Sequence, residues 1–319
     1  MSSLYGSISG MSGILSIRIS ESHSSPSATA IIECENHSVD LGDEINIDLG
    51  YVGDSDVVFN GYVKLIEQNI PENTYNITLN DKMTRAIDYF IASSDPDSPF
   101  SRSNISAEDL VGDVFSLANL NSYEYETSYF TFGINNPVEV NLESVYDFNN
   151  RIATLLAYHI WCDNSGTVHF KRRMPYIMDG DTYTHEISAS EILEEDYSVS
   201  EKDLRNRVVV YGNDGVYAEA SAVSPYLPTD FYKSVVYASS ILVQTNDMAQ
   251  TIADYNLDKL NRLTESMSIN IVGRTDISAR DIIRVTPVTL SIGTLDWYVY
   301  AIEQSFESEG FTTTLELRK

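Results

Sequence analysis

The residues best suited by type to metal binding are His159, Cys162 and His169, which flank a short turn in the middle of the chain. Imidazole and thiolate groups are common zinc ligands, but they must converge on one point. Side chains alternate along a strand, so we expect His159 and Cys162 to lie on opposite faces of a hairpin. The sequence therefore predicts no metal site. The second cysteine, Cys34, is far away in the sequence, so no disulfide framework is expected.

Paired carboxylates occur at Glu194 and Glu195 and at Asp179 and Asp181. Such a pair acts as general acid and base only where a cleft shifts one pKa, whereas these pairs lie in acidic segments where solvated charge is the simpler interpretation. The sequence contains no nucleophile elbow, no phosphate-binding glycine loop and no His-Glu-x-x-His motif. It therefore indicates no enzyme, no catalytic residue and no cofactor.

The composition is that of a soluble, strongly acidic protein. The chain has 319 residues, of which 43% are hydrophobic, and 20 basic against 47 acidic residues give a net charge of −27. Such a surface repels phosphate, which disfavours sequence-independent binding of nucleic acid. The sequence has neither an apolar run long enough to span a membrane nor the layout of a signal peptide. We expect synthesis in the cytoplasm and no membrane span.

Two stretches near opposite ends of the chain have similar sequence patterns, as expected of a repeated element. Residues 59–68 and 75–79 form one copy, and residues 295–304 and 311–315 form the other. Short runs of β-branched and aromatic residues between turn-forming residues predict a β-hairpin in each. A constant shift pairs Tyr62 with Tyr298, Ile66 with Ile302, Glu67 with Glu303, Gln68 with Gln304, Tyr75 with Phe311 and Leu79 with Leu315. We interpret this as duplication of a β module.

The remaining patterns divide the chain into three parts. Residues 1–86 read as a first β-barrel module, with strands within 14–19, 28–34, 44–49, 57–68 and 75–80. Residues 87–203 read as an inserted α+β domain, with helices capped by Ser106 and Ser144 and an irregular acidic segment at 172–203. Residues 204–319 read as a second β-barrel module that contains one helix capped by Asn246. The expected fold is mainly β with an α+β insertion.

Several motifs occur in an order that resembles one known family. They are LGDEINI at 41–47, FNGYV at 59–63, DNSGTVHF at 163–170, NRVVVYG at 206–212 and GFTTTLEL at 310–317. This order is similar to that of the phage tail hub family, which includes the baseplate hub proteins and the late control gene D proteins of tailed phages. The resemblance covers nearly the whole chain.

The resemblance implies a structural function and a set of partners. In that family the two β modules are barrels of the tail-tube type, and a homotrimer places six modules in a ring that joins a sixfold tail tube to a threefold spike or tip. A duplicated module suits such a symmetry adaptor. The implied partners are the tail tube protein above, the spike or tail-tip protein below and other baseplate proteins. The implied location is the virion tail, and because the sequence ends at Lys319 we expect the spike to be a separate protein.

The acidity gains an interpretation from the resemblance. Three copies would carry three times the charge of −27, and a channel lined with carboxylates would let DNA pass during ejection without binding it. Glu67, Glu303 and Glu316, on or beside the duplicated hairpins, are our candidates for such a lining. Because Glu67 and Glu303 match through duplication, they are not candidates for a catalytic pair.

Three alternatives remain at this stage. The first is the hub of a phage-derived contractile injection system. The second, from a different class, is a tail-associated hydrolase of cell wall or polysaccharide that uses a carboxylate pair from residues 191–196. The third is a carbohydrate-binding adhesin, which is disfavoured because an adhesin does not need a duplicated barrel with an inserted domain.

Overall fold

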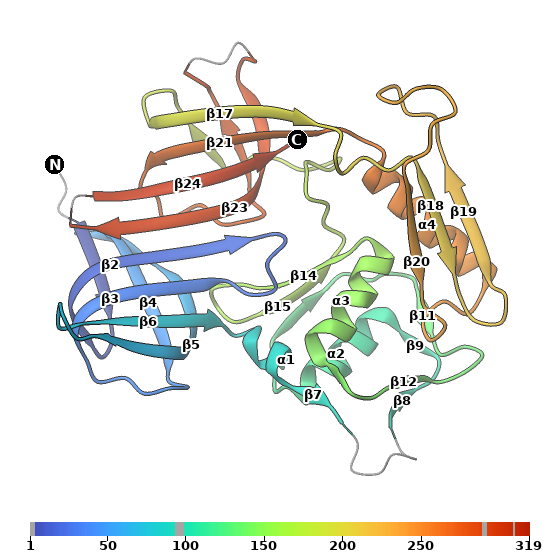
Figure 1. Cartoon of the computed structure of the whole chain (residues 1–319), viewed down its shortest axis with the longest axis horizontal. Helices are drawn as coiled ribbons and strands as arrows, with labels where there is room; N and C mark the ends of the chain where they lie inside the picture. Colours follow the sequence, from blue (N-terminus) through green and yellow to red (C-terminus); the bar gives the residue numbers. More distant parts are fainter. Residues whose placement is uncertain (1–3, 93–98, 289–291, 309) are drawn as a thin grey trace.

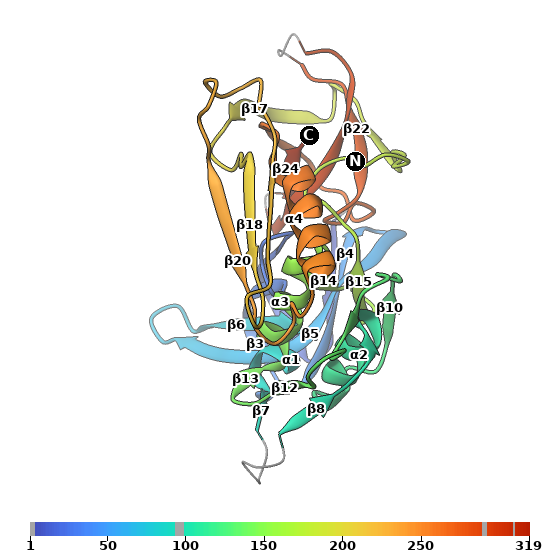
Figure 2. The ribbon, with the colours of Figure 1, turned by 90° about the vertical axis from the view of Figure 1, so that its right-hand side faces the viewer.

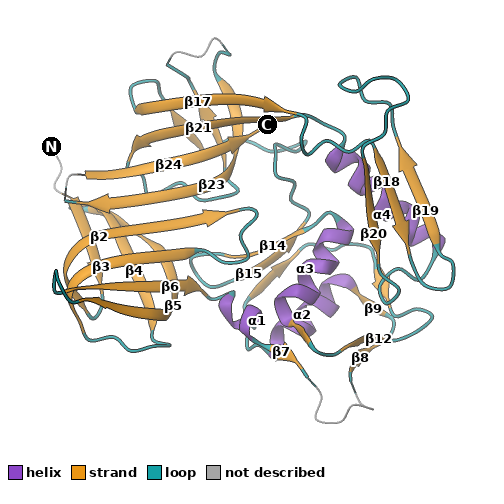
Figure 3. Cartoon of the chain, in the orientation of Figure 1, coloured by secondary structure: helices purple, strands orange, loops and turns teal. Residues whose placement is uncertain are grey.

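The computed structural model describes residues 4–92, 99–288, 292–308 and 310–319. Strands dominate these residues, as the sequence predicts, and helices are confined to one side of the molecule (Figure 3). The two β modules lie on the left of Figure 1, the central helices lie below and to their right, and a smaller sheet with a helix forms the right-hand edge.

One twelve-stranded sheet contains both predicted hairpins. In spatial order its main path is β1 (Leu4–Ile8), β4 (Glu44–Tyr51), β5 (Asp54–Asn69), β6 (Thr74–Asp81), β3 (Thr29–His37), β2 (Met11–Ser22), β23 (Leu295–Glu307), β24 (Gly310–Arg318), β21 (Thr264–Val272) and β17 (Ile192–Ser200). Off this path, β22 (Ile282–Val285) pairs with β23, and β16 (His185–Ile187) pairs with β22. All pairs are antiparallel except β16 with β22.

The two β modules are joined through their strands. The first module consists of β1 to β6, and the second consists of β16, β17 and β21 to β24; each has its own apolar cluster. Strand β2 pairs with β23 from Ser16 opposite Glu307 to Ser22 opposite Ala301. We call this pairing the internal joint. Because the joint hydrogen-bonds two strand edges that would otherwise be unpaired, the strands of the two modules form one continuous sheet.

The duplication extends to the details of the backbone. Ile45 lies opposite Gly61 in the first module, and Ile283 lies opposite Trp297 in the second. A register shift interrupts β5–β6 between Val63 and Leu65. The corresponding shift interrupts β23–β24 between Val299 and Ala301, which is the position that the sequence alignment of the two hairpins predicts. A bulge at the same place in both hairpins supports a common origin.

The predicted equivalence of the second strands is wrong by two residues. Val63 pairs with Leu79, but Val299 pairs with Leu317 and not with Leu315. By the same reasoning, the structural counterpart of Tyr75 is Thr313 and not Phe311. The cause is the hairpin end: Asn69 pairs with Thr74, whereas β23 and β24 continue to Glu307 opposite Gly310. The second hairpin is longer, and this moves the alignment of its returning strand.

The central unit packs short helices against small sheets. Ser106 and Ser144 cap their helices through hydrogen bonds to the amides of Asp109 and Asp147, as predicted. Its helices are α1 (Thr84–Asp88), α2 (Ala107–Leu117) and α3 (Val145–Leu156). Its strands are β7 (Phe90–Ile91), β8 (Phe100–Arg102), β9 (Ile105–Ser106), β10 (Tyr123–Tyr125), β11 (Thr131–Phe132), β12 (Val138–Val140), β13 (Glu143–Ser144), β14 (His159–Cys162) and β15 (Val168–Lys171).

A further sheet and helix belong to the same core as the central unit. Strands β18 (Arg207–Tyr211), β19 (Tyr217–Ser221) and β20 (Ser234–Ala238) form the sheet, and α4 (Asn246–Leu260) packs on it (Figure 2). Val208 and Ile252 share one apolar cluster with Phe115 and Phe148 of the central unit. The first half of the predicted module 204–319 therefore contributes to the central core. Thr245, not Asn246, caps α4.

The acidic segment at 172–203 is more ordered than its composition suggests. It contains β16 and β17, which belong to the second β module and not to the inserted domain. Strand β17 pairs with β21 along most of its length, from Ile192 opposite Ile271 to Ser200 opposite Thr264. Backbone pairing with β21, which is distant in the sequence, stabilises the strand conformation of β17. The side chains of β17 alone therefore do not predict a strand.

Candidate functional site

The side of the twelve-stranded sheet that faces away from the apolar clusters is polar, and we call it the polar sheet face. Ser, Thr and Asn occupy many of its positions, because side chains alternate and the opposite face takes the apolar residues. The pairing registers place these acidic residues on it: Glu33, Glu67, Glu194, Asp196, Glu303, Glu307 and Glu316. The basic residues on these same strands and this face include Arg18 and Arg318.

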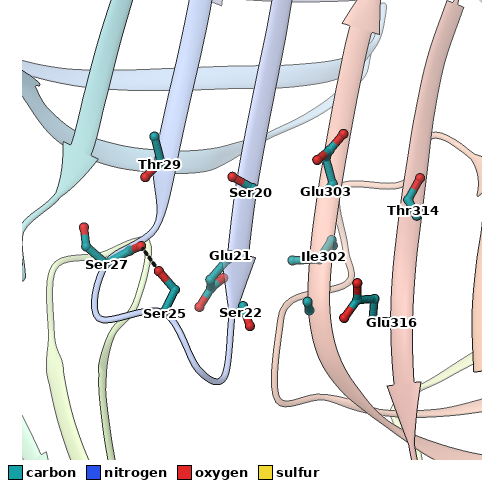
Figure 4. A pocket seen from close by; sticks show the side chains of 11 residues that line it. Ser20, Glu21, Ser22, Ser25, Ser27, Thr29, Ile302, Glu303, Thr314 and Glu316 are labelled. Carbon is teal, nitrogen blue, oxygen red and sulfur yellow. Dashed lines mark hydrogen bonds between the residues drawn. The ribbon is translucent and has the colours of Figure 1, made fainter. Parts of the chain in front are cut away.

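Two of the three predicted lining residues lie in one hollow of this face. Glu303 is opposite Thr314, and Glu316 is opposite Ala301 on the neighbouring strand. Both carboxylates border a shallow cavity of about 350 Å³ at the internal joint (Figure 4). Glu67 lies at the position on β5 that corresponds to Glu303, opposite Asn76, and is exposed outside this cavity.

The cavity has the character of a polar surface rather than that of a reaction centre. Ser20, Ser22, Ser25 and Thr29 contribute hydroxyl groups to its wall. Glu303 lies 3.6 Å from the guanidinium of Arg18, and both side chains are about half exposed. Such an exposed pair contributes at most about 1 kcal/mol, and water screens it. The arrangement suits repulsion of anions and hydrogen bonding to water more than proton transfer.

A buried ion pair anchors the joint at the edge of the cavity. Glu21 of β2 pairs with Arg280, whose side chain is only 6% exposed. Arg280 also donates to the carbonyl of Ser22 and lies over the ring of Trp161 in the central unit, 5.1 Å from its centroid. This one guanidinium therefore contacts the first module and the central unit while belonging to the second module. Removing it would leave the carboxylate of Glu21 half buried without its partner.

The histidines of the predicted hairpin belong to a stack of aromatic rings. His159 stacks on His23 of the first module at 3.9 Å between ring centroids and on Trp161 at 5.4 Å, and Trp161 stacks on His169 at 4.7 Å. His23 hydrogen-bonds the hydroxyl of Tyr298 at 2.6 Å. Cys162 faces the apolar core, on the other side of the strand from His159. Within the described ranges, no cluster of His, Cys, Asp or Glu could hold a metal ion.

Two histidines of the stack, His23 and His159, have lowered pKa values. Burial, followed by the charge of Arg280, lowers the pKa of His23 to about 2. Burial, followed by His23 itself, holds the pKa of His159 well below its usual value. These rings therefore join the first module, the central unit and the second module as uncharged aromatic surfaces. This junction could not be predicted from the sequence, because its members are far apart in the chain.

The carboxylate pairs do not converge. Glu194 and Glu195 are successive residues of β17, so their side chains point to opposite faces. Asp181 accepts hydrogen bonds from Arg173 at 2.7 Å and from the amide of Met178 at 2.8 Å, which is a structural role. Glu191 accepts from Ser188 and lies 3.4 Å from Arg274, and these partners lower its pKa against the opposing effect of burial.

Two strands of the twelve-stranded sheet, β17 and β5, have edges without a partner among the described strands. Among the described strands, β17 pairs with β21 alone, and its second edge is open. Strand β5 pairs with β4 only as far as Tyr62, so the same side of β5 from Leu65 onward has no partner among the described strands. Leu65 and Val199 are 45% and 51% exposed on these edges. Open edges with apolar side chains favour pairing with another chain.

No helix in the described part of the chain has the length and apolar character that a membrane crossing requires.

Comparison with solved structures identifies the fold. The chain superposes on a tail protein from Neisseria meningitidis MC58 with a TM-score of 0.71 at 12% identity, covering 99% of this chain and 96% of that one. A 43 kDa tail protein of prophage MuSo2 from Shewanella oneidensis gives the same TM-score at 13% identity, with 99% and 98% covered. No protein-family model matches the sequence, and no curated protein sequence matches it.

A third similar structure comes from a secretion machine. It is an E. coli component of the type VI secretion system that is itself structurally similar to the T4 bacteriophage tail proteins gp27 and gp5. It superposes with a TM-score of 0.57 at 10% identity and covers 98% of this chain and 76% of that one. The fold that the sequence resemblance indicated, that of tail and baseplate proteins, is confirmed.

Proposed function

We propose that this protein is a structural hub of a phage tail or baseplate and that three copies form a pseudo-sixfold ring. The observation that carries the proposal is the duplicated β module within a chain that has the fold of phage tail proteins over its whole length. Three chains with two similar modules each present six similar surfaces, which suits contact with a sixfold tube on one side and a threefold spike or tip on the other.

The polar sheet face would line the channel of this ring. Glu67, Glu303 and Glu316 lie on this face and are exposed, which is the requirement that a lining residue must meet. Their charge would repel the phosphates of passing DNA and so prevent its retention during ejection. The protein would act in the virion tail after synthesis in the host cytoplasm, with the tail tube protein, the spike or tip protein and other baseplate proteins as partners.

Electron microscopy of the protein mixed with the tail tube protein of the same genome tests this function. We expect rings with a central opening and tube ends closed by such rings. Tube ends that stay bare, with no ring in any preparation, would overturn the proposal.

A second candidate is the hub of a phage-derived contractile injection system. The similarity to a type VI secretion component favours it, and the same ring would then pass protein or support membrane puncture. Neighbouring genes for capsid and terminase proteins indicate the phage, and their absence beside sheath and tube genes indicates the injection system.

The hydrolase alternative finds less support, because the similar structures are tail proteins and Glu194 and Glu195 diverge. Assays of the purified protein on peptidoglycan and capsular polysaccharide decide the matter. Hydrolysis that Glu194→Gln abolishes would show that the protein is an enzyme, and absence of hydrolysis would support the structural function.

A further inference from the structure

Strand β17 is the second module's counterpart of β2. Strand β2 pairs with β3 with a register shift between Ile14 and Ser16, and β17 pairs with β21 with a register shift between Ile192 and Glu194. Counting from these shifts, Ser20 of β2 corresponds to Ser198 of β17. In each module this strand precedes the one that pairs with the returning strand of the duplicated hairpin. The two strands therefore occupy the same place in the repeated architecture.

The outer edges of β2 and β17 differ in their pairing. The outer edge of β2 pairs with residues 301–307 of β23 in the internal joint. The outer edge of β17 pairs with no strand that the structure describes, and the same is true of the stretch of β5 that corresponds to residues 301–307. One chain thus contains one completed joint and the two separate halves of a second joint. The halves lie far apart in the sheet: β17 is its last strand, whereas β5 lies between β4 and β6 near the other end, and Figure 1 shows β17 above the internal joint and β5 below it.

Exposure shows what the missing joint would cover. Gln304 is 4% exposed beside β2, whereas its counterpart Gln68 is exposed. Ile302 is 6% exposed, whereas its counterpart Ile66 is only partly buried. Ile70, at the end of the open stretch, is 80% exposed. The open stretch of β5 therefore has the surface of a joint whose second strand is absent.

We infer that β17 of one copy pairs antiparallel with the open stretch of β5 in a second copy, in the register of the internal joint. The internal joint places Ser20 opposite Glu303 and Ile19 opposite Gln304. Transferred through the duplication, this places Ser198 opposite Glu67 of the second copy and Tyr197 opposite Gln68. We call this pairing the external joint. The inference rests on the proposed ring, for which it specifies the contact between copies.

The position of the two halves explains why a closed ring would form. Each copy offers a β17 edge in its second module and a β5 edge in its first, so the contact joins two different surfaces and is head to tail. A head-to-tail contact gives a ring when its rotation closes and a filament when it does not. If the external joint repeats the geometry of the internal one, internal and external joints alternate around a ring of similar modules. Three copies of the chain then supply the six modules of the ring.

The two joints differ in charge. In the internal joint, Arg18 lies 3.6 Å from Glu303. In the external joint the counterpart of Arg18 is Asp196 and that of Glu303 is Glu67, so an attractive pair becomes a repulsive one. The external joint should therefore be weaker and should strengthen with added salt, which screens exposed charges. A weak joint between copies suits a hub that assembles only in the presence of its partners.

Disulfide trapping tests the register directly. Ser198→Cys with Glu67→Cys places two thiols directly opposite each other, at a separation that a disulfide can span, while the native Cys34 and Cys162 are buried. On mild oxidation we expect covalent dimers and trimers. The matched control, Ser198→Cys with Glu33→Cys, puts the second thiol two strands away on the same face and should give none. The charge test is Asp196→Arg, which should tighten association about fivefold at each joint, and Glu67→Arg added to it should cancel the gain.

The outcomes separate this inference from the proposed function. Cross-linking by the Glu67 pair and not by the control supports the external joint. If the protein is trimeric by mass but the Glu67 pair does not cross-link, the external joint is wrong and the hub function stands. If the chain remains monomeric with its tube protein present and gives no cross-link, both are overturned.

Discussion

The backbone carbonyl of Asp281 accepts a hydrogen bond from the amide of Val299 at 2.8 Å. Asp43 and Val63 make the same bond at 3.0 Å in the first module. In each case the aspartate carboxylate also closes the preceding turn, by accepting from the amide of Ser278 at 2.7 Å or of Asp40 at 2.8 Å. The two modules thus share a turn, a strand pair and a bulge, although few side chains in these elements are identical.

The shared turn gives the first prediction. Asp281 is half-buried and Asp43 is exposed. A hydrogen bond to a charged acceptor is worth about 1.5–3 kcal/mol, and less where water replaces it. Asp281→Ala should therefore lower the free energy of unfolding by about 2 kcal/mol, and Asp43→Ala by less than about 1 kcal/mol. Urea unfolding followed by tryptophan fluorescence measures both. Equal losses would show that burial does not determine the strength of this turn.

A glycine on β5 gives a second prediction. A Cβ at Gly61 would lie 2.2 Å from the carbonyl oxygen of Asn80 on the paired strand, so the backbone would have to move. Gly61→Ala should destabilise the protein by about 2–3 kcal/mol. Gly310→Ala is the matched control, because a Cβ there meets no atom within 4 Å. Thermal unfolding of the two variants compares them, and a Gly61→Ala variant as stable as the control would contradict the strand register.

The duplicated hairpins could be predicted from sequence because residues such as Ile66, Glu67 and Gln68 recur in the same order as Ile302, Glu303 and Gln304. A strand pair repeats its alternation wherever it is copied, so local pattern was sufficient. The helix caps Ser106 and Ser144 were predictable for the same reason. These features depend on neighbours in the chain.

Features that depend on distant partners could not be predicted. The acidic composition of β17 is typical of a loop. Its strand conformation comes from pairing with β21, which is distant in the sequence. The joint of β2 with β23 and the stack of His23 on His159 link segments that carry no common pattern. The sequence places Glu303 and Glu316 on or beside the second hairpin, but only the strand registers show that they share a face.

The buried histidines predict a loss of stability in acid. The pKa of His23 and that of His159 are lowered in the folded state, so the unfolded chain binds more protons below about pH 6.5. Their contribution is complete above that pH and is lost as the pH falls, by about 1.4 kcal/mol per pH unit for each histidine. The surrounding cations oppose protonation further: Arg173, Lys259, Arg280 and Arg318.

A conservative variant isolates this effect. His159→Phe keeps an aromatic ring in the stack but cannot be protonated, and the Nε2 atom that it removes has no hydrogen-bond partner. Between pH 6.5 and pH 5 its unfolding free energy should fall less steeply than that of the native protein, by about 1.4 kcal/mol per pH unit. Parallel slopes for the two proteins would show that His159 takes no part in the acid response.

The proposed lining predicts how charge controls DNA. The native protein should not retain duplex DNA, whereas Glu67→Lys, Glu303→Lys and Glu316→Lys combined should bind it at low salt and release it as salt rises. The control reverses three exposed carboxylates outside the polar sheet face, Asp179, Asp214 and Asp230, with the same change in net charge. Filter binding measures both. Equal retention by the two variants would mean that net charge acts, and not this face.

The mass of the assembled species shows whether the protein forms a trimer. We would measure it by analytical ultracentrifugation at low and high salt, for the protein alone and with its tail tube protein. We expect a species of three times the 35.7 kDa of one chain, favoured by salt and by the tube protein. A protein that stays monomeric or forms only dimers under every one of these conditions would contradict the proposed trimer.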